Sequence, residues 1–490
     1  MLSYLSSSLL DSYHHSAVDN PQKGYENFPA KILQFGSGNF LRGFVGFFVE
    51  KANRKGIFRG RIIVVQSTNQ RATDTFSKQD CLYTLLEQGI LRGVPTRQFT
   101  IVSAIQSCIS AQQEWEKVLK YAENSRIHII VSNTTEAGIV LDAQDSIFQT
   151  PPSSFPAKLL AVLYRRWQTY GSQAKGFVIL PCELLVENGT QLKSIVEKLA
   201  ELHQLPNAFV EWLQTQNLFC NTLVDRIVPG KPSDLQEIFQ TLGYVDHMLT
   251  ACEFYRLWAI EGNQDELIAK VPFLSADEGI VIAPDITPYR ERKLRILNGG
   301  HTIAAALGFL KGFTTVDECL QDSEMKNFFR CVILDEIAKT LPYDEQETTF
   351  FAQEVLTRFS NPFLHHQLLS ICLEYTTKMR MRNVPTFFRY YEKFNKLPVL
   401  MCKGFAAFLV FMLSVKEENG KFVGEWKGKT YSIQDTHAPV WIKKNAVFPS
   451  QPLETYVHQV VSDTTLWGQN LASLPGFVNA VAHEMQILVS

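Results

Sequence analysis

The stretch KILQFGSGNFLRG, from Lys31 to Gly43, decides the fold. Residues 31–35 are apolar enough for a short buried strand, and the segment FVGFFVEKAN that follows Arg42 has the apolar spacing of a helix. Between them stand Gly36, Ser37 and Gly38. Glycines at a strand-to-helix turn let the backbone approach a pyrophosphate, whose charge then lies at the helix N-terminus. The stretch predicts a dinucleotide-binding turn, with an ordinary strand–turn–helix as the alternative.

The match to the dinucleotide fingerprint is imperfect, because its third glycine, Gly43, comes late. Arg42 lies inside the loop, where a guanidinium could pair with phosphate through two hydrogen bonds. Asn39 and Phe40 lie at the predicted helix start. We therefore take these loop residues, together with the glycines and Ser37, as candidate coenzyme contacts.

Further buried strands are predicted at residues 61–67, 127–133 and 176–182, with helical patterns such as AQQEWEKVLKYAE between them. Buried strands that alternate with helices favour an α/β fold, a Rossmann-type doubly wound domain with a mainly parallel sheet. From about Pro288 onward, long segments with a 3.6-residue apolar period predict a mostly α-helical C-terminal domain. The pair Asn419-Gly420 predicts a small hairpin within it. We expect a dinucleotide-binding domain at residues 25–285 and a helical substrate and catalytic domain at 286–490.

The ends of the second and third strands carry polar side chains where ligands bind in open α/β sheets. The second strand ends in Gln66-Ser67-Thr68-Asn69 without the acid that holds an adenosine ribose, so Gln66 or Asn69 would take that role. Arg71 could instead accept a 2′-phosphate, which leaves the choice between NAD and NADP open.

The third strand is followed by Asn133-Thr134-Thr135-Glu136. From this run we take Asn133, Thr134 and Glu136 as further candidate coenzyme contacts. A capping box at a helix start is the structural alternative for the same residues, since Thr is followed closely by Glu.

Composition excludes several classes of function. The 490 residues have a net charge of −2, so no basic footprint for nucleic acid is expected. Nine cysteines are dispersed without a C-x-x-C pair or zinc-site spacing, which favours reduced thiols in a cytosolic protein. The first residues lack a basic segment, and no apolar run reaches the roughly 18 residues of a membrane span. We expect a cytoplasmic protein without a membrane or nucleic-acid partner, and its oligomeric state stays open.

The segment from Pro288 to His301, PYRERKLRILNGGH, contains the residue types of an acid–base site. On a helix Asn298 and His301 share a face, and Lys293 lies one and a half turns earlier. A lysine buried beside other cations exchanges protons near neutral pH, and an amide can donate to a developing alkoxide. The alternative is a solvated basic helix with a core histidine. The adjacent glycines 299 and 300 favour the first interpretation, because glycine in a helix suggests close approach by another group.

The chain resembles the long-chain mannitol dehydrogenase family across nearly its whole length. Seven motifs in the same order carry this resemblance: QFGSGNFLRGFV, SNTTEAG, LPCELLVENG, NTLVDRIVPG, EFYRLWAIEG, PYRERKLRILNGGHT and RFSNPF. The resemblance implies a metal-independent, NAD-dependent oxidoreductase. It also implies that Lys293 is the catalytic lysine, that Asn298 and His301 support it, and that Asp225 lines the substrate site. An ion pair of Asp225 with Arg226 is the structural alternative.

The resemblance further implies a particular branch of the family. Polyol-oxidising members have an Asn where this chain has Leu184, and the segment YSIQDTHA also resembles the uronate-reducing branch. The expected reaction is reduction of D-tagaturonate to D-altronate, with a polyol 2-dehydrogenase or fructuronate reductase as the alternative. A dinucleotide-binding sensor or a carbohydrate-binding protein are the alternatives from other classes. A uronate carboxylate needs a cation, and the candidates are Arg295, Lys378, Arg380 and Arg382.

Overall fold

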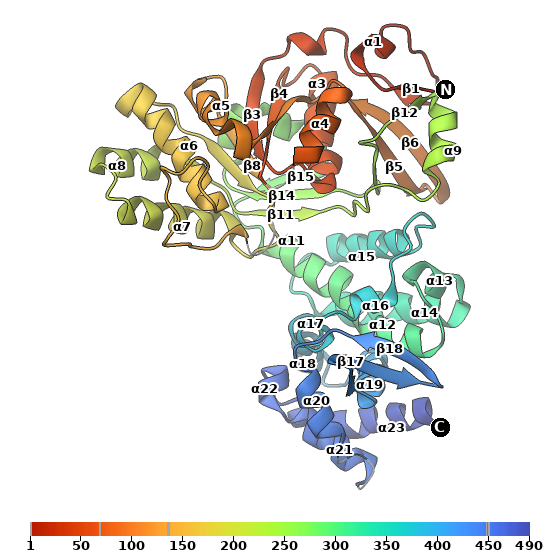
Figure 1. The fold of residues 1–490 in the computed structure, drawn as a ribbon. Coiled ribbons are helices and arrows are strands. Elements are labelled where there is room, and N and C mark those ends of the chain that lie inside the picture. The colour runs from red at the N-terminus through yellow and green to blue at the C-terminus, as the bar shows by residue number, and fades with distance from the viewer. Residues whose placement is uncertain (1, 68–69, 135–137, 447, 449–450) are drawn as a thin grey trace. The chain divides into compact units, whose positions relative to one another are not determined.

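A computed structural model describes all of the chain except residues 1, 68–69, 135–137, 447 and 449–450. The chain folds as two units (Figure 1), one formed by 1–91 with 96–286 and the other by 92–95 with 287–490.

The first unit is built on a parallel sheet that is six-stranded within the described residues, in the order β10-β9-β8-β3-β4-β7. In chain order this is 6-5-4-1-2-3, the arrangement of a Rossmann fold. The strands are β3 (Ala30–Phe35), β4 (Arg61–Gln66), β7 (Ile105–Ser110), β8 (Ile129–Ser132), β9 (Val178–Pro181) and β10 (Leu218–Phe219). The chain reverses its direction of winding between β3 and β8, so a ligand site is expected beyond the carboxyl ends of these two strands.

The two faces of this sheet pack into different cores, because successive side chains on a strand point to opposite sides. Leu33 and Phe35 pack in a core with four helices, while Ile32 and Val64 pack in a core with the helix that follows β3. The four helices are α5 (Ala111–Glu123), α6 (Phe155–Tyr170), α7 (Asn188–Leu202) and α8 (Asn207–Gln216), which Figure 1 shows grouped on one side of the sheet. The doubly wound α/β prediction is confirmed.

The helix after β3 begins at α2 (Asn39–Leu41), continues as a π-helical segment at Arg42–Gly46, and ends as α3 (Phe47–Arg54). A Cβ on Gly43 would lie 2.9 Å from Val228 Cγ1, and a Cβ on Gly46 would lie 2.0 Å from the Tyr83 hydroxyl oxygen. Two glycines therefore allow close packing of this helix, where the fingerprint expects one.

The rest of the first unit adds smaller sheets and short helices. One sheet has the order β13-β5-β6-β2 and another the order β11-β14-β15, and β1 pairs with β12. Sequence patterns did not predict the β5–β6 hairpin or β7, because their strands mix apolar with polar and charged residues. The elements are β1 (Ser3–Tyr4), α1 (Ser7–Leu10), β2 (Val18–Asp19), α4 (Gln70–Lys78), β5 (Tyr83–Leu91), β6 (Val94–Val102), β11 (Thr222–Asp225), α9 (Leu235–Leu242), β12 (Tyr244–Val245), β13 (Thr250–Cys252), β14 (Leu257–Glu261), α10 (Gln264–Lys270) and β15 (Ile280–Ala283).

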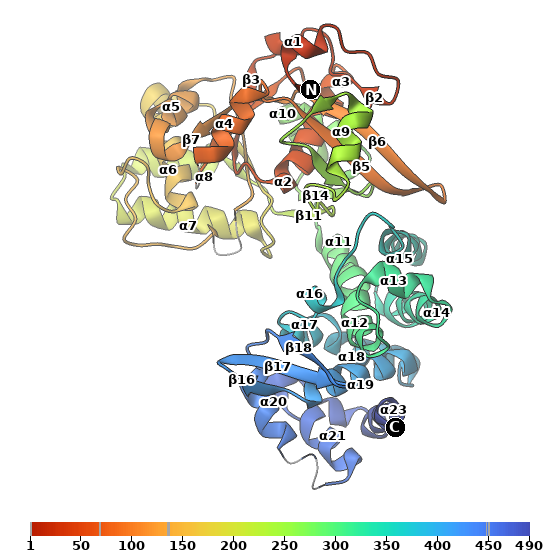
Figure 2. The same ribbon diagram turned by 45° about the vertical axis from the view of Figure 1, so that its right-hand side comes forward.

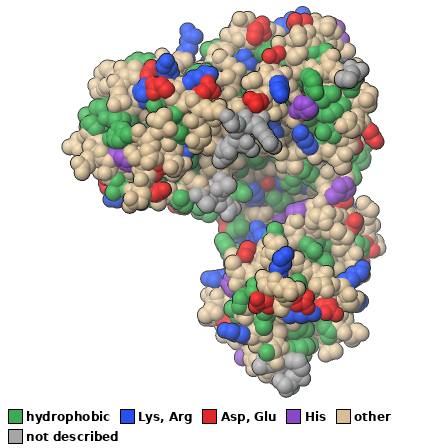
Figure 3. All heavy atoms as spheres, viewed as in Figure 1, with side chains coloured by type: hydrophobic (Ala, Val, Ile, Leu, Met, Phe, Trp, Pro, Cys, Tyr) green, Lys and Arg blue, Asp and Glu red, His purple; other side chains and the backbone are tan. Residues whose placement is uncertain are grey.

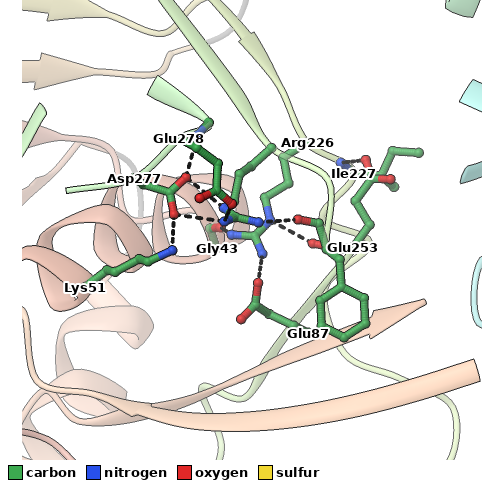
Figure 4. A network of polar contacts seen from close by, with 11 residues as sticks. Gly43, Lys51, Glu87, Arg226, Ile227, Glu253, Asp277 and Glu278 are labelled. Carbon is green, nitrogen blue, oxygen red and sulfur yellow. Dashed lines mark hydrogen bonds and ion pairs between the residues drawn. The ribbon is translucent and has the colours of Figure 1, made fainter. Parts of the chain in front are cut away.

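A buried ionic network ties the helix after β3 to the strands around it (Figure 4). Arg226 follows β11, and its guanidinium donates to the Gly43 carbonyl at 2.7 Å and pairs with Glu87 of β5 at 2.5 Å. Lys51 of α3 pairs with Asp277, whose side chain is fully buried. Buried charges are tolerated when they are paired in this way.

The second unit is mostly helical, as predicted (Figure 2). A long helix begins at α11 (Thr287–Arg292), passes through a π-helical segment at Lys293–Gly299, and continues as α12 (Gly300–Leu310). The unit also contains α13 (Val316–Gln321), α14 (Ser323–Cys331), a π-helical segment (Val332–Ile337), α15 (Glu345–Phe359), α16 (Leu368–Ile371), α17 (Tyr375–Arg382), α18 (Val384–Phe394), α19 (Val399–Leu413), α20 (Ala438–Asn445), α21 (Leu453–Val461), α22 (Thr464–Trp467) and α23 (Phe477–Val489).

A small antiparallel sheet of β16 (Lys416–Glu418), β17 (Lys421–Trp426) and β18 (Lys429–Ile433) interrupts the helices of this unit. Asn419 and Gly420 form the turn between β16 and β17 with φ of +52° and +72°. The predicted hairpin is confirmed and has one further strand.

On the face viewed in Figure 3, acidic and basic side chains are interspersed over both units, consistent with the balanced composition. In the described part of the chain, no helix is both long and apolar enough to cross a membrane.

We expect Gly46→Ala to lower the free energy of unfolding by about 1–3 kcal/mol, because the new methyl group overlaps the Tyr83 hydroxyl. Gly38→Ala is the matched control on the same helix. Nothing lies within 4 Å of its added Cβ, and its backbone φ of −66° suits any residue. Urea denaturation measures both variants, and equal stability of the two would contradict this account of the helix packing.

Candidate active site

The loop after β3 has the geometry of a pyrophosphate cradle. Gly36 has φ +123°, a conformation that side chains rarely adopt, and a Cβ there would meet the Asn133 carbonyl at 3.0 Å. A Cβ on Gly38 would meet no atom within 4 Å, so open space lies in front of the helix N-terminus. The loop stands at the reversal of winding between β3 and β8, where open α/β sheets bind ligands. These features fit a dinucleotide.

Arg42 braces the loop in this structure, and its predicted contact with phosphate stays a prediction. Its guanidinium donates to the Ser37 carbonyl at 2.7 Å, to Thr250 Oγ1 at 3.0 Å and to the Asn39 side chain. Burial lowers the pKa of this guanidinium. All three nitrogens are therefore engaged in holding the loop and the helix start, and Arg42 shapes the cradle.

The carboxyl ends of β8 and β9 are joined by a buried acid, Glu183. Its carboxylate accepts from Ser132 Oγ at 3.1 Å, from the Thr134 backbone N–H at 2.9 Å and from Thr134 Oγ1 at 3.1 Å. Asn133 Nδ2 donates to the Cys182 carbonyl at 2.8 Å. The polar run after β8 thus fixes the edge of the sheet beside the glycine loop. Glu136 lies outside the described residues.

Two other positions from the sequence lie at this edge. Gln66 ends β4 with a side chain that is 4% exposed, and the Cys108 thiol lies 3.9 Å from its Oε1. Leu184, which stands where polyol-oxidising enzymes carry Asn, has an exposed side chain directly after Glu183. Asn69 and the Arg71 side chain lie outside what the structure describes.

In the second unit Lys293 and Asn298 lie within the π-helical segment Lys293–Gly299. In an α-helix a residue five positions on would lie about 140° around the axis. A π-helix closes its hydrogen bonds between residues i and i+5, so the sixth residue returns over the first. The π segment therefore brings the lysine and the amide onto one face, which the α-helical geometry assumed from the sequence does not do.

His301 lies at the start of α12, buried against α17 and its neighbours. Its ring centroid is 6.1 Å from that of Phe359 and 5.7 Å from that of His366. Burial, with Arg382, His366 and Lys378 nearby, holds the pKa of His301 well below its usual 6.5. The imidazole is therefore neutral at physiological pH.

Lys378 and Arg382 of α17 bring positive charge to this histidine. Arg382 NH1 donates to Thr302 Oγ1 at 3.0 Å, and Lys378 Nζ donates to the Ile371 carbonyl at 3.0 Å. Burial lowers the pKa of Arg382 to about 10, and burial together with Arg382 lowers the pKa of Lys378. Among the described residues neither forms an ion pair with an acid. Two partly buried cations thus lie one helical turn apart with no ion pair to an acid among the described residues, although the Glu374 carboxylate acts on Lys378 electrostatically.

Arg295, another predicted carboxylate ligand, is committed to the protein. It pairs with Glu291 at 3.2 Å and donates to the carbonyls of Met381 and Arg382 at 2.5 and 3.1 Å. Its role is to join the π segment to the end of α17. Gly300, directly after the same segment, would place a Cβ 2.9 Å from Cδ1 and Cγ1 of Ile333. The close approach that the paired glycines predicted is present.

Asp225 ends β11 and is 4% exposed. The guanidinium of its neighbour Arg226 is directed to Glu87 and the Gly43 carbonyl, so the strand end that bears Asp225 is tied to the helix after β3. The structure thus fixes the backbone beside Asp225 from within the first unit.

One group of side chains in the described parts of the chain has the spacing of a metal site: Glu374, Asp435 and His437. Its carboxylate oxygens already accept hydrogen bonds, from the Thr376 backbone N–H and hydroxyl at 2.7 Å and from the Thr436 hydroxyl at 2.8 Å. These acids serve as backbone caps.

The chain was compared with known protein families. Residues 30–270 match the mannitol dehydrogenase Rossmann domain, and residues 285–489 match the mannitol dehydrogenase C-terminal domain. The chain belongs to the mannitol dehydrogenase family. This confirms the resemblance that the seven motifs indicated.

Several relatives in this family share about a third of their residues with the chain. Altronate oxidoreductase of Yersinia enterocolitica is 37% identical over 472 residues, which cover 94% of this chain and 95% of that protein. Altronate oxidoreductase of Bacillus subtilis is 37% identical over 460 residues, which cover 94% and 92%.

Two solved structures share the fold of this chain. A D-sorbitol dehydrogenase in substrate-free form matches with a TM-score of 0.82 and 21% identity, covering 99% of this chain and 98% of that one. The Pseudomonas fluorescens mannitol 2-dehydrogenase complex with NAD and D-mannitol matches with a TM-score of 0.71 and 22% identity, covering 99% and 97%.

Sequence reasoning missed two residues that organise this member of the mannitol dehydrogenase family. Glu183 could have been suspected as an acid directly after a buried strand. Tyr375 is fully buried, and its hydroxyl donates to the Thr302 carbonyl at 2.8 Å and accepts from the Ala306 N–H at 2.9 Å. No local pattern signals such an insertion into a distant helix.

We expect His301 to make the protein less stable as pH falls from 7 to about 5.5. Its folded pKa is below 6.5, so the unfolded chain takes up a proton in this range while the buried ring does not. His301→Asn should flatten the pH dependence of the unfolding free energy by about 1 kcal/mol. Denaturant titrations at both pH values test this, with the exposed His483→Gln as control. A slope unchanged in His301→Asn would contradict a neutral buried ring.

Proposed function

We propose that this chain catalyses the NADH-dependent reduction of D-tagaturonate to D-altronate, in both directions according to substrate supply. The altronate oxidoreductases it matches along nearly their whole length support this activity. The observation that carries it is the pair of cations on α17, Lys378 and Arg382, which lie beside His301 without an acidic partner among the described residues. A polyol has no group to neutralise them, whereas a uronate brings a carboxylate.

The first unit would hold the coenzyme. The N-terminus of the helix after β3 faces the space at Gly38, and backbone N–H groups there would receive the pyrophosphate. Gly36, Ser37, Asn39 and Phe40 form the cradle, with Arg42 bracing it. Gln66, Asn133, Thr134 and Glu136 are the candidates for the remaining coenzyme contacts. When bound, the reduced nicotinamide supplies a hydride to the ketone carbon.

The second unit would supply the proton and hold the oxygen. As the carbonyl carbon gains the hydride, its oxygen develops negative charge, and the Lys293 ammonium donates a proton to give the alcohol. Asn298, on the same face of the π segment, donates a hydrogen bond to that oxygen. His301, neutral because it is buried among cations, orients a substrate hydroxyl. In the oxidative direction neutral Lys293 takes the proton back.

The substrate carboxylate would bind to Lys378 and Arg382. Removing cations from water without a partner is costly, and an arriving carboxylate offsets that cost. Arg295 leaves this set because its guanidinium is engaged with Glu291 and two carbonyls. Asp225 is a further candidate for a substrate contact. We also propose a cytoplasmic location, because the nine dispersed cysteines are typical of reduced thiols.

We expect rapid loss of NADH absorbance at 340 nm with tagaturonate, and much slower loss with fructose, which has the ketone but no carboxylate. Fructuronate separates the two uronate reactions, because it differs from tagaturonate only in stereochemistry. Activity with fructuronate or fructose in place of tagaturonate would identify the related reductase or a polyol enzyme. Absence of turnover with every substrate would favour a dinucleotide-binding sensor.

In the same assay Arg382→Met should lower kcat/KM for tagaturonate by about a hundredfold, equivalent to a lost charged hydrogen bond of roughly 3 kcal/mol. Arg380→Met is the matched control, because Arg380 is on the same helix with an exposed side chain. Equal effects of the two substitutions would place carboxylate recognition elsewhere.

Lys293→Ala should lower kcat by a factor of about 10³, because general acid–base catalysis contributes roughly 10²–10⁴. NADH binding, measured by the change in its fluorescence on mixing, should stay nearly unchanged because the coenzyme cradle lies in the other unit. Turnover close to that of the unsubstituted enzyme would remove Lys293 from the mechanism.

A further inference from the structure

The segment Gln434–His437, which follows β18, contacts the beginning of α17. Asp435 is 5% exposed, and its Oδ2 accepts from both the backbone N–H and the hydroxyl of Thr376 at 2.7 Å. Its Oδ1 accepts from the His437 N–H at 2.8 Å. Two of these hydrogen bonds join the loop to the helix, and the third is formed within the loop.

Further bonds between the same two segments reinforce this contact. The Glu374 N–H donates to the Gln434 carbonyl at 2.7 Å, and the Thr436 hydroxyl donates to Glu374 Oε2 at 2.8 Å. The Thr376 hydroxyl also accepts from Trp441 Nε1 at 2.8 Å. Glu374 holds φ +49°, so the chain turns sharply where α17 begins. The first turn of the helix is therefore clamped by the sequence QDTH.

The same helix is fixed to α12 and to the π segment on its other side. Tyr375 inserts its hydroxyl between the Thr302 carbonyl and the Ala306 N–H, and Asn383 Nδ2 donates to the Gly299 carbonyl at 3.0 Å. Lys378 and Arg382 lie between these anchors. The position of both cations relative to His301 depends on where the first turn of α17 is held.

We propose that Asp435 is a positioning residue for the substrate carboxylate, acting through Thr376 and α17 on Lys378 and Arg382. This inference rests on the proposed function, because it assumes that these cations receive a carboxylate. It also gives a physical role to the segment YSIQDTHA. The hairpin β16–β18 leads the chain into the clamp, and the clamp sets the reach of two cations one turn apart.

The sign of the effect separates positioning from simple charge. If Asp435 acted only through its negative charge, its removal would make the site more positive and tighten the binding of an anion. If it acts by position, its removal lets the first turn of α17 shift and weakens the binding. Displacement of a binding group by about 1 Å costs up to a hundredfold.

The experiment measures binding by isothermal titration at saturating NADH, a condition in which the product cannot react. The ligands are D-altronate and altritol, which has a hydroxymethyl group in place of the carboxylate. We expect unsubstituted protein to prefer altronate, and Asp435→Asn to weaken altronate binding by about tenfold or more while altritol binding changes less than twofold. Thr376→Val should reproduce the defect and Thr376→Ser should restore preference, because serine keeps the hydroxyl.

Glu336→Gln is the matched control for loss of a buried capping acid. Glu336 is 7% exposed and accepts from the Leu400 and Met401 N–H groups at 2.9 and 2.7 Å, at the start of α19. The substitution should cost stability without changing the preference for altronate, and a thermal melt of each variant checks that it is folded.

The outcomes separate the two proposals. Tighter binding of altronate by Asp435→Asn, or a loss of preference equal to that in Glu336→Gln, would overturn the positioning role and leave the proposed function intact. An unsubstituted protein without preference for altronate and without tagaturonate turnover would overturn both. Turnover of tagaturonate without that preference would overturn the inference alone.

Discussion

The insertion of the Tyr375 hydroxyl between the Thr302 carbonyl and the Ala306 N–H is the contact on which the second unit depends. The hydroxyl bonds to a backbone group on each side of it, so a shift of either helix would leave buried polar groups unpaired. His301 directly precedes Thr302 in α12. Lys378 and Arg382 lie one and two turns after Tyr375 in α17. The relation between His301 and the two cations of α17 is thus set by the contact of the two helices. Helix α19 also packs closely against α12, where Gly404 faces the Ile303 carbonyl, and this contact further fixes α12.

Each unit has a π-helical segment at the position of its candidate functional residues. In the first unit Arg42–Gly46 brings Gly43 and Gly46 against Val228 and Tyr83, which seats the helix whose N-terminus faces the open side of Gly38. In the second unit Lys293–Gly299 aligns a lysine with an amide five positions later. A π turn weakens the regular ladder of a helix, and it persists only where surrounding contacts hold it. Arg226, bonded to the Gly43 carbonyl, and Asn383, bonded to the Gly299 carbonyl, are such contacts.

The sequence was sufficient for the architecture because that depends on local patterns. Apolar runs gave β3, β4, β8 and β9, apolar periodicity gave the helical second unit, and Asn419-Gly420 gave a hairpin. The sequence did not predict β7 or the β5–β6 hairpin. Their strands combine apolar residues with polar or charged ones, so no clear strand pattern is visible before the fold is known. For the site, residue type could place Lys293, Asn298 and His301 on one helix but could not reveal its π geometry. Nor could it distinguish arginines that brace the protein, Arg42 and Arg295, from Arg382, which carries its charge to the site. That distinction depends on partners distant in the sequence.

The unpaired cations of α17 link stability to selectivity. Without ligand they reduce the stability of the fold, since burial disfavours charge on Lys378 and Arg382 and each repels the other. A carboxylate neutralises both, while a neutral sugar of the same size would have to leave them desolvated and unpaired. A site built for a polar group rejects a substrate that lacks it more strongly than an apolar pocket rejects a wrong shape. On the proposed function, two desolvated cations held on one helix would favour a uronate over a polyol before any substrate binds. This preference would depend on the contact between Asp435 and Thr376 to hold the two charges in place.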